Sequence, residues 1–252
     1  MLHNLRRGAV STVGGKGEQN GDAAGALSSR SVKLCLLGKK LEGIGGNKQS
    51  SGQGRLVTLS GPEQVLHFWE VEESRIERVK TTVLDCIPSS ITALTVDVSR
   101  NVLFLGSSAG TVHQLHLWSF ILDKEVISEE QLLANVPEEH QENPGEVVQV
   151  AMNPFLDDQV MVAFSQGFMM LWSTDSRSCL NILKSSQKLQ GVCWRSEDEF
   201  FSAHDDGSFT VWDSENGAQI QAAHTPYGPY PCRAIRQLYC KEAGDIRWCI
   251  FR

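Results

Sequence analysis

The chain has 252 residues, of which 41% are hydrophobic and 21% are charged, and its 22 glycines suit a β-rich protein with many turns. A formal net charge of −7 and a pI near 5.5 argue against broad nucleic-acid binding, which normally needs a basic face. No apolar run approaches the roughly 18 residues of a membrane-spanning helix, and residues 1–13 lack the apolar region of a secretory signal.

The seven cysteines are an odd number and are scattered along the chain. Most lie within apolar runs, such as Cys193 between Val192 and Trp194. Free cysteine in such a setting behaves as a small buried hydrophobe. This usage predicts a reducing compartment and therefore an intracellular protein.

Residues 1–30 are rich in Gly, Ala and Ser and show little periodicity, which predicts a disordered leader. The basic residues Arg6, Arg7 and Lys16 resemble those of a transit peptide, although the amphipathic pattern of such a peptide is missing. We predict one domain over 31–252, beginning with a strand at 31–37.

A strand-turn-strand unit recurs four times after this first strand. Its copies end at Trp69, Leu115, Trp172 and Trp212, at separations of 46, 57 and 40 residues. These separations are close to the length of one propeller blade. A further strand-like run precedes each later copy, at 91–98, 146–152 and 189–194. The pattern therefore predicts an all-β chain, a partial WD40-type β-propeller of about four blades.

The turns inside the later copies each carry a glycine, Gly110, Gly167 or Gly207, where a tight hairpin requires positive φ. Asp206 precedes the last of these and is a typical turn residue. In the strand that follows Gly207, alternation places Phe209 and Val211 on one face and Thr210 and Trp212 on the other.

The longest interval, between the second and third copies, contains an insertion that we assign to residues 117–146. Ser128 with Gln131 three residues later forms a capping-box pattern, and Pro137 ends the run. We predict a short helix at 128–135, on a surface where loops can carry binding function.

An enzyme interpretation would use His204, Asp205 and Asp206 as an acid and base group. These residues lie in a turn between two strands, where turn geometry explains the acids, and no partner nucleophile accompanies them. We therefore predict no catalytic residue and no cofactor.

A zinc site would have to use residues near the C-terminal end of the sequence. Their spacing of eight or nine residues is what successive strands produce, and no paired Cys-x-x-Cys is present. We predict no metal site among these residues: His224, Cys232, Cys240 and Cys249.

Two proline-containing loops, 143–146 and 226–231, are candidates for docking a partner protein. In the second, prolines stiffen the backbone and Tyr227 and Tyr230 offer wide contact area, with Arg233 just beyond. The alternative is a rigid crossover whose aromatic residues pack on the adjacent blade, and the sequence favours this alternative.

Several segments resemble the lethal giant larvae family. The most specific is 226–235, a Pro-Tyr-Gly-Pro-aromatic-Pro-Cys-basic-Ala-Ile run, which follows a WD40-like hairpin at 205–212. The Gly-His dipeptide that usually opens a WD40 repeat is missing throughout. The resemblance covers 31–252 and corresponds to the early part of the family's first propeller. The other matching segments follow the family's order: 54–59, 153–154, 164–167 and 183–189.

The resemblance implies a non-catalytic scaffold built on WD40 propellers, acting in cell polarity, cortical actomyosin organisation and polarised exocytosis. The implied partners are non-muscle myosin II, the Par6 and atypical protein kinase C complex, and syntaxin-type SNAREs. The implied location is the cytoplasm, the cell cortex or the periphery of the plasma membrane. Tomosyns, which regulate syntaxin, are the nearest relatives expected, and a tomosyn-like regulator, a generic WD40 adaptor and a propeller hydrolase remain as alternatives.

The resemblance has limits, because the family has two seven-bladed propellers and this chain contains only four hairpin units. The kinase-regulated basic loop of the family's second propeller has no counterpart here, so regulation by that kinase is not inferred. About four blades would leave strand edges unpaired, and we expect such a chain to aggregate or to need a partner.

Overall fold

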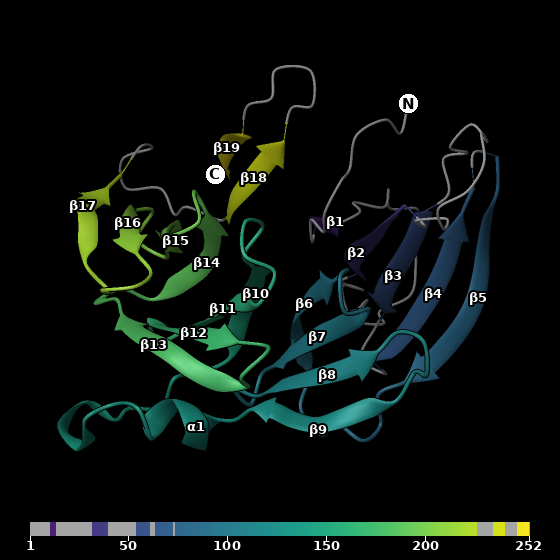
Figure 1. Ribbon diagram of the computed structural model, residues 1–252, viewed down its shortest axis with the longest axis horizontal. Coiled ribbons are helices and arrows are strands. Elements are labelled where there is room, and N and C mark those ends of the chain that lie inside the picture. Colours follow the sequence, from purple (N-terminus) through teal and green to yellow (C-terminus); the bar gives the residue numbers. More distant parts are fainter. Residues whose placement is uncertain are drawn as a thin grey trace, which may run out of the picture. The chain divides into compact units, whose positions relative to one another are not determined.

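The computed structural model describes residues 11–13, 32–39, 54–60, 64–72, 74–225, 234–239 and 246–251. The chain divides into two compact units, one with the strands up to β5 and the other with the elements from β6 onward. Figure 1 labels the elements of both. All strand pairs in both units are antiparallel, which confirms the all-β, propeller-like expectation.

The first unit is one five-stranded sheet, here called sheet 1, with its strands in chain order. It consists of β1 (Ser11–Val13), β2 (Val32–Lys39), β3 (Gly54–Ser60), β4 (Val65–Val71) and β5 (Ile76–Val83). The strand expected at 31–37 is β2. Of the leader predicted to be disordered, only β1 lies within the described residues, and it pairs with β2.

The second unit contains three four-stranded sheets, each an up-and-down meander in chain order, and one two-stranded sheet. Sheet 2 consists of β6 (Ile91–Asp97), β7 (Val102–Ser107), β8 (Val112–His116) and β9 (Leu122–Ile127). Sheet 3 consists of β10 (Val147–Met152), β11 (Gln159–Phe164), β12 (Phe168–Ser173) and β13 (Ser178–Lys184). Sheet 4 consists of β14 (Leu189–Trp194), β15 (Glu199–His204), β16 (Phe209–Asp213) and β17 (Gln219–His224). Sheet 5 consists of β18 (Ala234–Tyr239) and β19 (Ile246–Phe251).

The four predicted hairpins are the strand pairs β3–β4, β7–β8, β11–β12 and β15–β16. The strand that precedes each later hairpin is the first strand of its sheet. Within the second unit, these first strands, β6, β10, β14 and β18, lie beside one another in turn. Successive sheets therefore meet along their first strands, as blades do around a propeller axis.

The insertion between sheets 2 and 3 is shorter than the predicted 117–146, because β9 (Leu122–Ile127) is the fourth strand of sheet 2. The helix α1 spans Glu129–Leu133, and the capping box of Ser128 and Gln131 is present. A 3₁₀ turn, η1 (Glu138–His140), follows, with Pro137 at its N-terminal cap rather than at the end of α1. No helix in the described segments is long and apolar enough to cross a membrane.

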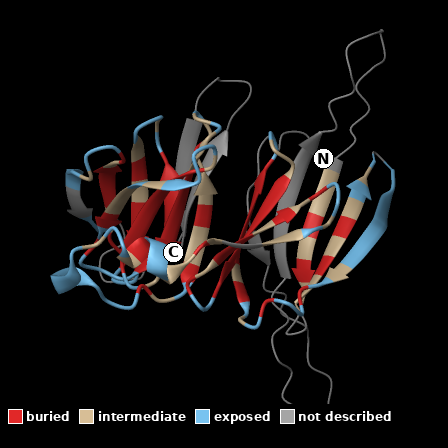
Figure 2. Ribbon diagram, turned by 60° about the horizontal axis from the view of Figure 1, so that its bottom comes forward, coloured by how far each residue is buried: buried red, intermediate tan, exposed pale blue. Residues whose placement is uncertain are grey.

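The apolar core of the second unit lies on both faces of sheet 3. One cluster joins sheet 3 to sheet 2 and includes Phe104, Phe164 and Trp172, with Leu132 of α1 buried in it. A second cluster joins sheet 3 to sheet 4 and includes Trp194 and Trp212. All six residues of β12 are buried, and Figure 2 shows the buried residues of the second unit in red. Because both of its faces are covered, β12 reads as a nearly continuous apolar run rather than an alternating one.

Hydrogen bonds also cross between neighbouring sheets. The Thr92 hydroxyl donates to the carbonyl of Val147 at 2.6 Å, and this links the first strands of sheets 2 and 3. The Trp194 indole donates to the carbonyl of Ala151 at 3.1 Å, which links sheets 4 and 3. These two bonds hold the first strands of sheets 2, 3 and 4 together.

Candidate functional site

Sheet 4 contains a buried network of hydrogen-bonded side chains. The indole N–H of Trp212 donates to Ser202 Oγ at 2.7 Å. Nε2 of His204 lies 2.9 Å from Ser202 Oγ and 3.2 Å from Thr210 Oγ1, and Nδ1 lies 3.5 Å from Ser185 Oγ. His204 is only 1% exposed. The network thus joins β15, β16 and the segment between sheets 3 and 4 into one unit.

The surroundings of His204 and Asp206 determine the pKa shifts and the hydrogen bonds of these two side chains. Burial lowers the pKa of His204, and the nearby Asp206 and Asp205 oppose this only in part. Asp206 accepts hydrogen bonds from the N–H and the hydroxyl of Ser208 at 2.9 and 2.6 Å. Burial alone would raise the pKa of Asp206, but these bonds from Ser208 leave it lowered. His204 makes its hydrogen bonds inside sheet 4, whereas Asp206 makes its hydrogen bonds within the turn. The two side chains are therefore not arranged as an acid and base pair.

Sheet 1 carries a rearranged version of this network. The indole of Trp69 donates to Thr58 Oγ1 at 3.0 Å, as Trp212 donates to Ser202. His67 stands opposite Thr58 in the strand pairing, and its Nε2 lies 3.1 Å from Ser60 Oγ. The histidine therefore lies on the second strand of the hairpin in sheet 1 (β4) but on the first strand of the hairpin in sheet 4 (β15), while the indole keeps a hydroxyl acceptor.

Sheets 2 and 3 differ more strongly from the hydrogen-bonded network of sheet 4. In sheet 2, Leu115 takes the place of the tryptophan, and Ser107, Thr111 and His113 form their own chain of contacts at 2.7 and 3.2 Å. In sheet 3 the equivalent positions are all apolar. The residues that replace Ser202, His204 and Thr210 there are Val162, Phe164 and Met170.

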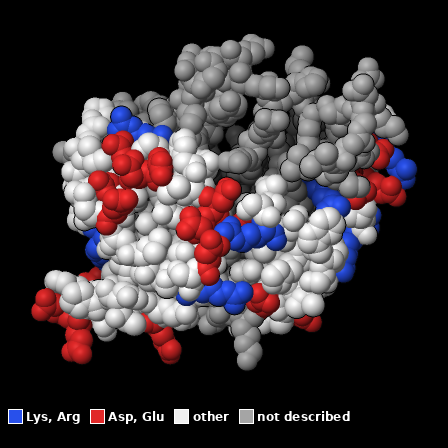
Figure 3. Space-filling view, viewed as in Figure 1, with Lys and Arg blue, Asp and Glu red and all other residues white. Residues whose placement is uncertain are grey.

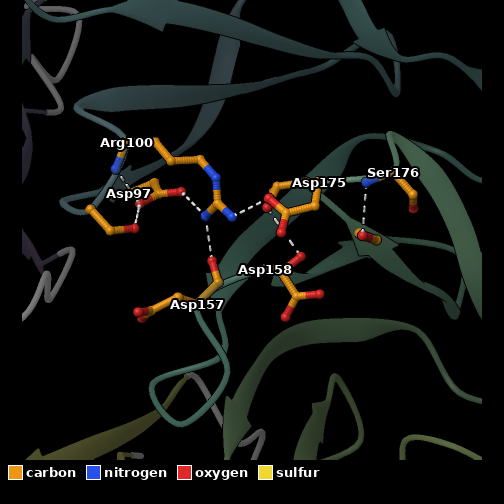
Figure 4. Close-up of polar contacts among 9 residues, drawn as sticks. Asp97, Arg100, Asp157, Asp158, Asp175 and Ser176 are labelled. Carbon is orange, nitrogen blue, oxygen red and sulfur yellow. Dashed lines mark hydrogen bonds and ion pairs between the residues drawn. The ribbon is translucent and has the colours of Figure 1, made fainter.

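A different polar cluster links sheet 2 to sheet 3 around Arg100, in the turn after β6 (Figure 4). Its guanidinium donates to the carboxylate of Asp97 at 2.9 Å, to the carbonyl of Asp157 and to the carboxylate of Asp175. The Asp97 side chain is 2% exposed and also accepts from the Ser99 hydroxyl at 2.6 Å. Burial alone would lower the pKa of Arg100, but the bonds to Asp97 and Asp175 leave it raised. The cluster links the two sheets, and the carboxylates of Asp97 and Asp175 are both paired with Arg100.

The insertion after sheet 2 forms an acidic surface. Its exposed acids include Glu130, Glu138, Glu139 and Glu142, and the segment 128–146 contains no Lys or Arg. Figure 3 shows the acidic side chains at the lower left, where Figure 1 places α1. Among the described residues, Lys184 of β13 contacts this surface and donates to Glu142 at 3.3 Å. The surface suits a basic protein segment better than an acidic ligand.

The turn between β8 and β9 exposes large apolar side chains that the sequence analysis did not single out. Trp118 is 68% exposed and Ile121 is 60% exposed. Trp118 keeps an interaction within the chain but leaves most of its surface open. Sequence reasoning missed it because Trp118 follows the apolar residues Leu115 and Leu117 and looked like a continuation of the strand.

The predicted turn residues occupy tight hairpins. Gly110, Gly167 and Gly207 have φ values of 76°, 98° and 86°, in the left-handed region. At Gly167, a Cβ atom would stand 2.5 Å from the carbonyl oxygen of Ser185, so the position has no space for a side chain. Trp172 and Trp212 are both 3% exposed and pack in the two core clusters.

Of the two predicted docking loops, only 143–146 is described. Its Asn143 side chain accepts from the N–H of Gly145 at 2.7 Å, and Pro144 accepts from the N–H of Gln166 at 3.0 Å. The loop is therefore fastened to the β11–β12 turn. The candidate contact residues Tyr227, Tyr230 and Arg233 lie outside the described residues.

Among the described residues, no group of three or more His, Cys, Asp or Glu side chains is arranged to hold a metal ion. His224 is exposed, and its ring lies against Phe209 with centroids 5.5 Å apart. The other residues considered for zinc, Cys232, Cys240 and the side chain of Cys249, lie outside the described part of the chain.

Comparison with known proteins adds relatives in sequence and likenesses to solved structures. No family model matches the sequence. The crystal structure of the computationally designed Ika8 protein superposes with a TM-score of 0.52 at 16% identity, covering 81% of this chain and 59% of that one. This likeness concerns the fold alone.

Several sequence relatives carry the name lethal(2) giant larvae. The mouse lethal(2) giant larvae protein homolog 1 is 28% identical over 218 residues, or 77% of this chain and 21% of the relative. The lethal(2) giant larvae protein of Drosophila melanogaster is 29% identical over 192 residues, or 75% of this chain and 16% of the relative. The zebrafish LLGL scribble cell polarity complex component 2 is 31% identical over 203 residues, or 74% of this chain and 20% of the relative. The chain therefore spans about a fifth of the length of these relatives, and over that span it belongs to the lethal giant larvae family.

Proposed function

We propose that the chain is a non-catalytic scaffold that acts in cell polarity by holding protein partners at the cell cortex. The observation that carries this proposal is the sequence match to lethal giant larvae proteins over about three quarters of the chain, including a relative named as a scribble cell polarity complex component. The polar side chains suggested for catalysis serve the interior of sheet 4, and this use supports a binding role.

The surfaces offered to partners differ in chemistry. The β8–β9 turn presents Trp118 and Ile121, and exposed tryptophan is typical of the energetic centre of protein interfaces. The insertion presents an acidic surface around Glu138 and Glu139, which favours encounters with basic partners. We propose that the apolar contact at the turn provides most of the binding affinity. The acidic insertion attracts basic partners electrostatically and so raises the rate of association.

Non-muscle myosin II, the Par6 and atypical protein kinase C complex and syntaxin-type SNAREs are the partners we propose to test first. Binding to them would place the protein in the cytoplasm, at the cortex or on the periphery of the plasma membrane. A tomosyn-like role in vesicle fusion is the second candidate, and it differs by requiring syntaxin binding without recovery of polarity proteins.

The experiment is proximity labelling by the tagged full chain in polarised epithelial cells. We expect enrichment of scribble-complex and cortical myosin proteins, reduced by the double substitution Trp118→Ser and Ile121→Ser. The matched control is Leu180→Ser on β13, which removes a side chain that is 49% exposed elsewhere in the second unit. Recovery of syntaxins alone would favour the second candidate. Labelling no different from that of an unrelated propeller protein would contradict both.

A further inference from the structure

The outer edge of sheet 1 is formed by β5. This strand ends the sheet order, and no other described strand pairs with its outer side. Seven of its eight residues are exposed and none is buried, as its pale blue colour in Figure 2 shows. The last strands of sheets 2 and 3 are better covered, since Ile127 of β9 and Leu183 of β13 are buried. The row of outward-facing N–H and C=O groups on β5 can accept another strand.

The side chains of β5 favour such pairing. Five of its eight residues are β-branched, and three of these, Ile76, Val79 and Val83, are between 51% and 60% exposed. β-Branched residues fit a pleated sheet well. An edge strand with this composition gains apolar contact when a second strand covers it, because cross-strand neighbours pack against each other.

A β-bulge at Val79 gives β5 an unusual charge arrangement. Arg78 pairs with Trp69 and Lys80 with Phe68, so Val79 is the extra residue. Glu77 pairs with Glu70, which lies on the same face of β4 as Phe68. The bulge therefore brings Glu77 and Lys80, three residues apart, onto the same face of the sheet. In a regular strand, residues at this separation point to opposite faces.

This arrangement is self-complementary. A two-fold axis perpendicular to the sheet, between Arg78 and Val79, would set Glu77 opposite Lys80 of the second copy, and Lys80 opposite Glu77 of the second copy. Moving the axis to Val79 would set Arg78 beside Lys80 of the second copy, but these side chains point to opposite faces of the sheet, so that register forms no such ion pairs. Charges on edge strands often prevent pairing, but in the first register those of β5 attract.

We propose that β5 is a homodimerisation edge, which pairs antiparallel with β5 of a second copy and is held in register by two Glu77–Lys80 ion pairs. Glu77 also pairs with Arg75 of its own chain at 2.9 Å, with both side chains more than half exposed. An exposed ion pair of this kind is weak, and a carboxylate has two oxygens, so Glu77 serves both cations. The pairing extends the scaffold by placing two sets of partner surfaces in one assembly.

The test is a charge swap across the proposed axis, read by size-exclusion chromatography with light scattering on the full chain. We expect the wild-type protein to approach twice its 27.8 kDa mass as concentration rises. Glu77→Lys sets lysine against lysine and Lys80→Glu sets glutamate against glutamate, so each variant alone is expected to stay monomeric. An equimolar mixture of the two, and the double variant, are expected to dimerise because both restore opposite charges.

Matched controls are Glu138→Lys and Lys188→Glu, which make the same changes in net charge at residues of the second unit. Circular dichroism checks that each variant is folded. Zero-length carbodiimide crosslinking of mixed ¹⁴N and ¹⁵N chains is expected to join Glu77 of one isotope to Lys80 of the other. A wild-type protein that stays monomeric, or a dimer that survives both single reversals, would overturn the proposal.

Discussion

Val162 lies in sheet 3 where Ser202 lies in sheet 4, and the indole of Trp172 consequently lacks the acceptor that Trp212 has. Within the described part of the chain, Trp172 Nε1 is the buried side-chain atom left without a hydrogen bond. The two sheets thus share the strand pairing and a buried tryptophan at the same position. The indole N–H is hydrogen-bonded in sheet 4 but not in sheet 3. An unsatisfied buried donor carries a desolvation penalty, so the two sites respond in opposite ways to substitution.

Replacing Ser202 by Ala is expected to lower the free energy of unfolding by about 2 kcal/mol, because the buried Trp212 N–H loses its acceptor and His204 loses a partner. Chemical denaturation measures the change. Ser202→Thr keeps the hydroxyl and is the matched control. Equal loss in both variants would indicate that shape at this position matters more than the hydrogen bond.

The converse substitution, Val162→Thr, is expected to raise the free energy of unfolding by roughly 1 kcal/mol, since the new hydroxyl can accept from Trp172 Nε1. Thermal unfolding followed by tryptophan fluorescence provides the measurement. Val160→Thr, which adds a hydroxyl at a buried position directly opposite Trp172, serves as the control and is expected to destabilise. A lower stability for Val162→Thr would show that the hydroxyl does not reach the indole.

Arg100→Met is expected to cost about 3 kcal/mol, because it leaves the carboxylate of Asp97 buried without its cation. Adding Asp97→Asn to this variant removes the stranded charge and is expected to recover part of the loss. A double-mutant cycle by urea unfolding gives the coupling between the two residues. Additive losses would contradict the pairing described here.

Gly167→Ala is expected to destabilise more than Gly217→Ala. Both glycines have positive φ, at 98° and 71°, which costs about 1 kcal/mol for alanine. At Gly167 the added Cβ would also stand 2.5 Å from the Ser185 carbonyl oxygen, whereas at Gly217 the nearest atom is 3.7 Å away. The difference in melting temperature isolates the steric contribution, and similar melting temperatures would argue against the tight turn.

Stability is expected to fall as the pH drops below the ordinary histidine pKa of 6.5. Burial lowers the pKa of His204 in the folded state, so the unfolded chain binds a proton there first. The contribution is present above pH 6.5 and is lost as the pH falls toward the folded-state pKa. Urea unfolding at several pH values measures the slope. His204→Gln is expected to flatten it, and an unchanged slope would assign the effect to another group.

The strands and tight turns were predictable from sequence because their signals are local. Gly167 and Gly207 lie between apolar runs, and the capping box of Ser128 and Gln131 needs only four residues to be recognised. The fourth strand of each four-stranded sheet was harder to predict from sequence. The sequence at 122–127 is half charged and lacks clear alternation, so it predicts part of an insertion rather than the strand β9.

The links between sheets were not predictable, because their partners are distant in sequence. Arg100 meets Asp157 and Asp175 across 57 and 75 residues, and nothing in the local sequence distinguishes it from an exposed arginine. The bulge at Val79 likewise depends on the pairing of β4 with β5. Such features arise from tertiary contacts, so they become visible only in the three-dimensional structure.

The differing polar interiors of the sheets have a consequence for how the chain avoids misfolding. Chains built from similar repeats are prone to mispair one repeat with the strands of another. A strand carrying Ser202 and His204, if exchanged with one carrying Val162 and Phe164, would bury hydroxyl and imidazole groups against apolar neighbours. The divergence of the repeats therefore makes such an exchange costly and favours the native strand pairing over the mispaired one.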